Sequence, residues 1–65
     1  MLIPFTDAQT ESTIFVNPKN VSVVFEGENP EGIRLTMINL LNGSVATTEP
    51  LLEVVGKIQG ELSYG

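Results

Sequence analysis

Apolar and polar residues alternate in short runs along most of this chain, and Gly, Pro, Asn and Asp separate the runs at regular intervals. Alternation with a period of two is typical of strands that bury one face, and closely spaced turn residues indicate an antiparallel meander. Pro4 cannot donate to a strand ladder, so the first strand should lie at an edge or carry a bulge. The pattern predicts five strands, at about residues 2–6, 12–17, 21–27, 33–40 and 44–48.

The third and fourth predicted strands carry apolar residues on both faces. In the third strand, Val24 and Phe25 are neighbours and therefore lie on opposite faces. In the fourth strand the apolar positions change parity at Ile38, where we expect a bulge or a strong bend. Between the last two strands, Asn42-Gly43 predicts a type I′ hairpin turn, in which both central residues have positive φ.

The hydrophobic period changes after Thr48, because apolar residues then recur at spacings of three and four. Thr48 is a suitable N-cap and Pro50 suits the first turn, so we expect a helix over about residues 49–60. Gly56 and Gly60 each cost about 1 kcal/mol relative to Ala in a helix interior, so packing must hold this helix. Its apolar stripe is predicted to consist of Leu51, Val54, Val55, Ile58 and Leu62.

These elements predict a mainly β protein with a C-terminal helix, folded as one domain over residues 1–65. Five short strands are too few for a sandwich of two full sheets. We expect instead a strongly bent, five-stranded antiparallel sheet that forms a small SH3-like or Sm-like barrel, with the helix plugging one end. The alternative is an open sheet with the helix laid across it.

A small hydrophobic core is the main constraint on a chain of 65 residues. Such a domain buries only about 60% of its unfolded surface, so a disulfide, a metal or a partner subunit usually adds stability. The chain has no Cys and no His, so we expect a homo-oligomer. A barrel interior needs only one apolar face, and Val24, Ile38 and Leu40 are therefore the predicted oligomer interface. The alternative is that Leu51 and Leu52 of the helix cover them.

The lack of Cys removes thiolate nucleophiles and the lack of His removes the commonest general base, so we expect no enzymatic activity, no cofactor and no metal site. Glu26, Glu28 and Glu31 crowd one turn, but they lack the alternating spacing of a calcium loop, and we interpret them as a solvated hairpin tip. Eight acidic and three basic residues give a net charge of −5, which repels polyanions. No apolar run is long enough to span a bilayer and the first residues lack the basic region of a signal peptide, so we expect a cytoplasmic protein with no membrane partner.

A longer pattern of residues resembles two groups of known proteins. The pattern consists of Phe15-Val16-Asn17-Pro18-x-x-Val21-x-x-Val24, then Asn42-Gly43, Thr48-Glu49 and Leu52-Glu53-Val54-Val55-x-Lys57-Ile58. Across about residues 2–60 it is similar to short proteins of the FlbD-like (SwrD) flagellar family. It also resembles a large group of short marine-phage proteins whose fold is a ring-forming Sm-like barrel.

The Sm-like resemblance implies a ring that binds RNA or single-stranded DNA, located in the host cell cytoplasm if a phage encodes the chain. In that family the connectors after strands two and four face the pore and carry the contacts. By position, these residues are Asn17, Lys19, Asn20, Asn42 and Gly43. We therefore expect a non-enzymatic small barrel that forms a homo-oligomeric ring for nucleic-acid processing. The alternative is a protein-only assembly or adaptor factor, related to a phage or to motility, whose acidic surface meets a basic partner.

Overall fold

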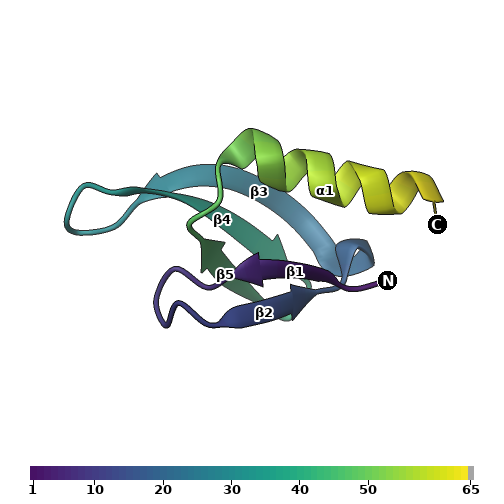
Figure 1. The fold of residues 1–65 in the computed structure, drawn as a ribbon, viewed down its shortest axis with the longest axis horizontal. Coiled ribbons are helices and arrows are strands. Elements are labelled where there is room, and N and C mark those ends of the chain that lie inside the picture. Colours follow the sequence, from purple (N-terminus) through teal and green to yellow (C-terminus); the bar gives the residue numbers. More distant parts are fainter. Residues whose placement is uncertain (65) are drawn as a thin grey trace.

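Five short strands and a C-terminal helix build the molecule (Figure 1). The computed structural model describes the backbone of residues 1–64 and the side chains of residues 1–62. The predicted class, mainly β with one C-terminal helix, is confirmed, although the helix begins and ends later than the predicted range. The elements are β1 (Ile3–Thr6), β2 (Thr13–Val16), a 3-10 turn η1 (Pro18–Asn20), β3 (Val21–Glu28), β4 (Arg34–Leu40), β5 (Gly43–Thr47) and α1 (Leu51–Tyr64).

The strands form two antiparallel sheets, one with the order β1-β2 and one with the order β3-β4-β5. The sheets meet where Asp7 bridges Thr47 and where the N–H of Ala8 donates to the carbonyl of Ala46 at 2.8 Å. The predicted single bent sheet and closed barrel are not confirmed, because neither sheet closes. β1 has four residues, and one of them, Pro4, has no N–H, so this strand offers little ladder for closure.

The core lies between the inner faces of the two sheets and α1, which contacts β1, β3 and β4 (Figure 1). Strand alternation turns one apolar set of each sheet inward, and the helical period does the same for two residues of α1. Within the predicted helical stripe, Val54 and Ile58 are buried, whereas Leu62 is exposed. The buried core consists of Ile3, Phe5, Val16, Ile38, Val54 and Ile58.

Of the three residues predicted to form the oligomer interface, one is fully buried within the chain and two are partly buried. Ile38 has 0% of its surface exposed, and Val24 and Leu40 are partly buried and pack against the core. Ile38 therefore has no surface to offer a second copy, and the prediction is wrong for this residue. The expected cover of these residues by Leu51 and Leu52 also differs from the observed packing. Leu52 is 84% exposed, and Val54 of the helix belongs to the core cluster instead.

The β-bulge lies in β3 and not in β4. The register passes from Val21 opposite Leu40 to Val23 opposite Asn39, so Ser22 is the extra residue. This insertion explains why the inner face of β3 changes parity while β4 alternates regularly. The bulge expected at Ile38 is therefore wrong, because the parity change belongs to the partner strand.

Two predicted local structures also differ from the observed ones. Residues Leu41 and Asn42 connect β4 to β5, and Glu11 is the one non-glycine with positive φ in the described part of the chain. The type I′ turn is therefore wrong. At the helix, the N–H of Val54 donates to the carbonyl of Pro50 at 3.0 Å, so the first helical bond starts at Pro50 and not at Thr48.

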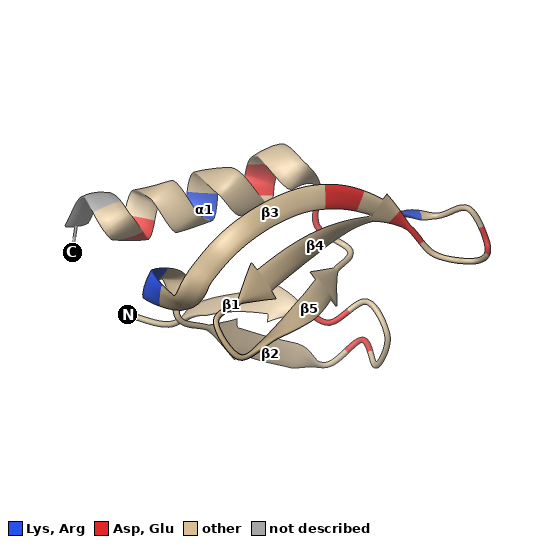
Figure 2. Ribbon diagram, turned by 180° about the vertical axis from the view of Figure 1, so that it is seen from behind, with Lys and Arg blue, Asp and Glu red and all other residues tan. Residues whose placement is uncertain are grey.

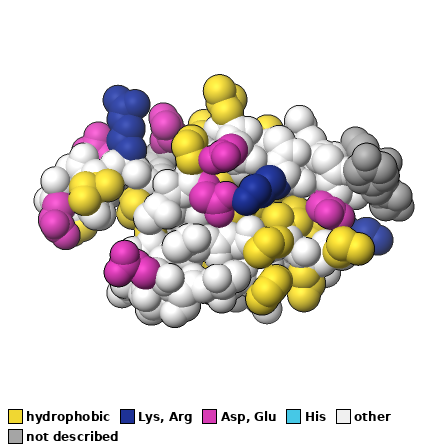
Figure 3. Space-filling model, viewed as in Figure 1, with side chains coloured by type: hydrophobic (Ala, Val, Ile, Leu, Met, Phe, Trp, Pro, Cys, Tyr) yellow, Lys and Arg dark blue, Asp and Glu magenta, His cyan; other side chains and the backbone are white. Residues whose placement is uncertain are grey.

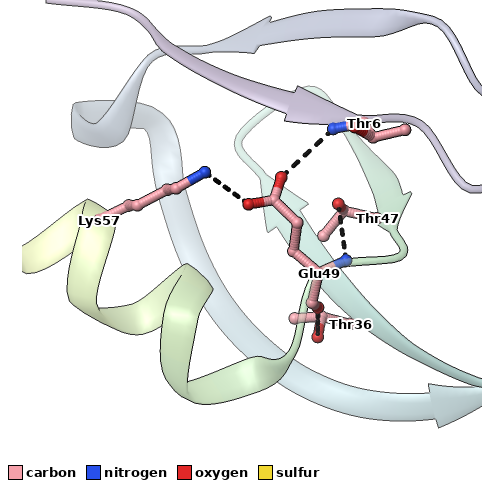
Figure 4. A network of polar contacts seen from close by, with 5 residues as sticks. All are labelled: Thr6, Thr36, Thr47, Glu49 and Lys57. Carbon is pink, nitrogen blue, oxygen red and sulfur yellow. Dashed lines mark hydrogen bonds and ion pairs between the residues drawn. The ribbon is translucent and has the colours of Figure 1, made fainter.

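Glu49 joins both sheets to the helix through four polar contacts (Figure 4). Its carboxylate forms an ion pair with the Lys57 ammonium of α1 and accepts from the N–H of Thr6 in β1 at 3.3 Å. Its carbonyl accepts from the Thr36 hydroxyl at 2.7 Å, and its N–H donates to the Thr47 hydroxyl at 3.3 Å. Thr36 is 1% exposed and Thr47 0%, so these hydroxyls have protein partners in place of water.

Replacing Thr36→Val should lower the free energy of unfolding by about 1–3 kcal/mol, because the isosteric side chain leaves the Glu49 carbonyl without its donor. Urea denaturation measures the change. Thr13→Val, at an exposed strand position, is the matched control and should stay within about 0.5 kcal/mol of the wild type. Equal stability of the Thr36 and Thr13 variants would contradict a structural role for this bond.

Candidate functional site

The two predicted nucleic-acid connectors lie side by side at one end of the molecule. Val21, which follows η1, is the Cα partner of Leu40, which precedes the β4–β5 turn. The N–H of Leu41 donates to the carbonyl of Asn20 at 3.0 Å and fixes the two connectors together. The structure thus brings Asn17, Lys19 and Asn20 close to Asn42 and Gly43.

Local structure already uses part of the polar chemistry at this end. The Asn17 side chain accepts from the N–H of Lys19 at 3.1 Å and caps η1, and the Asn17 carbonyl accepts from the N–H of Asn20 at 3.0 Å. Lys19 is exposed and is the cation of this end. Figure 2 shows Arg34 at the opposite end of the molecule, at the start of β4, whereas Lys57 lies on α1, which contacts η1, and pairs there with Glu49. The geometry supplies one positive charge per copy at the connectors.

The acidic hairpin tip is solvated, as predicted. Glu26, Glu28 and Glu31 are all exposed. Among the residues that the structure describes, no group of three or more acidic side chains is arranged to hold a metal ion. In the same part of the chain, no helix is long and apolar enough to cross a bilayer.

Asp7 begins the turn between β1 and β2, which the sequence pattern predicts as a polar turn over residues 7–11. Its carboxylate accepts from the Thr10 hydroxyl at 2.8 Å and from the N–H of Gln9 at 3.3 Å. The pKa of Asp7 lies below its ordinary value of 3.8, mainly because the Thr10 hydroxyl stabilises the carboxylate and, to a smaller extent, because the N–H of Gln9 does so. The turn therefore presents a fixed negative charge at neutral pH. Glu11, at φ 61°, completes it by donating its N–H to the Asp7 carbonyl.

The face of the β3-β4-β5 sheet that points away from the core is apolar, and we call it the outer face. Phe25, Met37 and Ala46 are register partners in one row across the three strands. In the next row Gly27 is opposite Leu35. A Cβ at Gly27 would lie 3.2 Å from Cγ of Met37, so the glycine leaves room for the methionine. The outer face consists of Val23, Phe25, Leu35, Met37 and Ala46.

Two loops flank the outer face and form a shallow trough over it. The residues at Ala8 and Gln9 form one wall, and the loop from Glu28 to Glu31 forms the other, above a floor of Leu35, Met37 and Ala46. A second hollow continues the trough past Asp7 and Ser44. The alternation of apolar residues in β3 and β4 could have indicated this floor, but the walls depend on how distant loops come together.

A second apolar surface, the hairpin patch, covers the outward side of β1 and β2. Figure 3 shows hydrophobic side chains gathered there, near the start of the chain. Pro4 and Phe15 are Cα partners across the two strands, and Phe15 is 64% exposed. A groove beside the patch runs between Pro4 and the α1 glycines, Gly56 and Gly60. The hairpin patch consists of Met1, Leu2, Pro4 and Phe15, all exposed.

In comparisons with known proteins, no protein-family model, no curated protein and no solved structure matches this chain. The flagellar and Sm-like resemblances therefore stay predictions from the sequence. The residues that they assign to nucleic acid lie together in the structure, but their function follows from no comparison.

Substituting Thr10→Val should raise the pKa of Asp7 toward 3.8, because it removes the hydroxyl that stabilises the carboxylate. An Asp with a lowered pKa contributes stability above its unfolded value, and this contribution is lost as the pH falls through the folded pKa. The wild type should therefore lose the stability that ionised Asp7 contributes as the pH falls below 3.8. The variant should protonate Asp7 at a higher pH than the wild type does. An NMR titration of the Asp7 carboxyl carbon measures the shift. Thr13→Val is the control that should leave this titration unchanged.

Proposed function

We propose that this chain is a non-enzymatic assembly module that self-associates and acts by contacting other proteins. The observation that carries the proposal is the distribution of its apolar side chains. Among the side chains of residues 1–62, six hydrophobic ones form the buried core, whereas nine large hydrophobic ones are exposed. The chain exposes 4486 Å² of surface, above the about 4,000 Å² expected for a folded monomer of 7.0 kDa. A second copy would remove part of this surface from water.

The hairpin patch is the surface that suits a second copy of the chain. Its groove contains one cation and one anion, Lys57 and Glu61, so two patches can meet without an excess of like charge. Gly56 and Gly60 leave open space where side chains would otherwise stand, which permits close approach to the helix. Phe15 is the member of the patch on β2, a strand whose other edge has no neighbour in the described chain. Patch against patch gives a two-fold symmetric pair.

Phe15→Thr should reduce self-association, because it removes the largest exposed side chain of the hairpin patch while keeping a residue that favours strands. Light scattering coupled to size exclusion measures the molar mass against the 7.0 kDa of one chain. We expect two or more copies for the wild type and a smaller mass for the variant.

Leu52→Gln is the control for that experiment, since Leu52 is exposed on α1 outside the patch. This variant should have the same molar mass in solution as the self-associated wild type. A wild type that stays at the mass of one chain at every concentration would overturn self-association. A ring of more than two copies would instead require the patch to meet a different surface of its neighbour.

Nucleic-acid binding at the connectors is a second candidate function. The observation that favours it is the bond from Leu41 to Asn20, which places both predicted connectors at one end. A ring would repeat Lys19 around its axis and so multiply a charge that one copy supplies once. Such binding would depend on phosphate contacts and weaken steeply with salt.

Lys19→Glu should abolish retention of a labelled oligo-uridine at low salt if the connectors bind RNA. Arg34→Glu makes the same change of charge at the opposite end of the molecule and should retain binding (Figure 2). Fluorescence anisotropy at increasing salt measures both. Absence of wild-type binding at low salt would end this second candidate and leave the self-association result unaffected.

A further inference from the structure

The trough over the outer face combines an apolar floor with one acidic wall, at Glu28 and Glu31, and with Asp7 in the hollow that continues it. The walls and the floor of Leu35, Met37 and Ala46 border an open hollow of about 480 Å³. This volume lies within the range of roughly 300–1,000 Å³ that is typical of ligand pockets. Phe25, beside Met37 in the same row, extends the apolar surface toward β3. Removing such a floor from water favours an occupant with apolar side chains.

The charged residues that line the trough are all acidic. Glu28 and Glu31 lie on one wall, and Asp7 lies at the other end, where its carboxylate is ionised at neutral pH. Figure 2 shows acidic residues on both loops, β1–β2 and β3–β4. No Lys or Arg lines the trough among the residues described. Arg34 is the register partner of Glu28 and lines a neighbouring hollow with Glu26, Gly27 and Glu28, so this cation lies beside the wall without lining the trough.

We propose that the outer face binds a segment of another protein that carries apolar side chains flanked by Lys or Arg. The apolar side chains would lie on Phe25, Leu35 and Met37, and the cations would face Asp7, Glu28 and Glu31 at the two ends. Complementary charges at the rim select the partner and speed its approach, while the apolar floor supplies most of the affinity.

The same charges disfavour the other occupants. A second copy placed face to face would bring the acidic walls of both chains together, whereas the hairpin patch offers a contact with mixed charges. Nucleic acid and anionic lipid would meet the same repulsion. The outer face and the hairpin patch also lie on separate sheets, so this inference does not depend on self-association.

The test uses a short, fluorescently labelled peptide of alternating leucine and lysine as the probe, with the full chain. Two matched peptides replace either every lysine by glutamate or every leucine by serine. We expect the leucine–lysine peptide to bind at least about tenfold more tightly than either control, measured by anisotropy. Its affinity should fall as salt screens the acidic wall. Equal binding of the serine–lysine peptide would overturn the apolar part of the inference, and equal binding of the leucine–glutamate peptide would overturn the charge part.

Variants then locate the binding site. Met37→Lys should reduce binding at least about tenfold, whereas Leu52→Lys, the same change on exposed helix surface, should not. Glu31→Gln, in an exposed loop, should weaken binding without altering the fold and covers the case in which Met37→Lys does not fold. The inference is overturned if Glu31→Gln binds the peptide as the wild type does and one further result is found. That result is either unchanged binding by a folded Met37→Lys variant or peptide-induced amide shifts that lie away from the outer face.

The Phe15→Thr variant separates this inference from the proposed self-association. It should bind the leucine–lysine peptide as the wild type does, whatever its own molar mass, because Phe15 lies on the other sheet. If the amides of Phe25, Leu35 and Met37 instead shift with protein concentration in the absence of peptide, a second copy occupies the outer face and the inference fails.

Discussion

The contacts of Glu49 hold the parts of this small protein together. The two sheets share one bridge, and Glu49 adds bonds to β1, β4, β5 and α1 from a single position in the chain. Its ion-pair partner, the Lys57 ammonium, also lies 5.2 Å from the centre of the Phe5 ring, so the polar contacts sit directly on the core. Because Thr36 and Thr47 are buried, the loss of either hydrogen bond would leave a buried polar group without a partner and lower the stability of the fold. These contacts add to the packing of Val54 and Ile58 into the core, which holds α1 over both sheets.

A small core and an uneven surface are two results of the same geometry. With both sheets open and one helix covering them, each sheet turns apolar residues inward and still exposes others outward. The outward residues differ in their electrostatic surroundings. Acidic loops border the outer face, whereas Lys57 and Glu61 balance each other beside the hairpin patch. This difference supports distinct partners for the two surfaces.

Local patterns in the sequence predicted the elements well, and pairing between elements poorly. Alternation located all five strands, and the period of three and four located α1, because both depend on neighbouring residues. The bulge at Ser22 depends on the partner strand, so the parity change was assigned to Ile38. The bond from Thr6 to Glu49 spans 43 positions, and no short pattern records it. For the site, adjacency of the two connectors came from a resemblance, and the acidic trough required loops that only the fold brings together.

The hairpin patch and the outer face occupy opposite sides of the core, so filling one leaves the other accessible. A two-fold pair of chains joined at Phe15 would carry two troughs at a fixed spacing. A partner with two basic segments would then bind the second one at a high effective concentration, and its avidity would exceed the affinity of either segment alone. The spacing between the troughs would decide which partners gain this advantage. The pair would therefore select partners by the distance between their two basic segments.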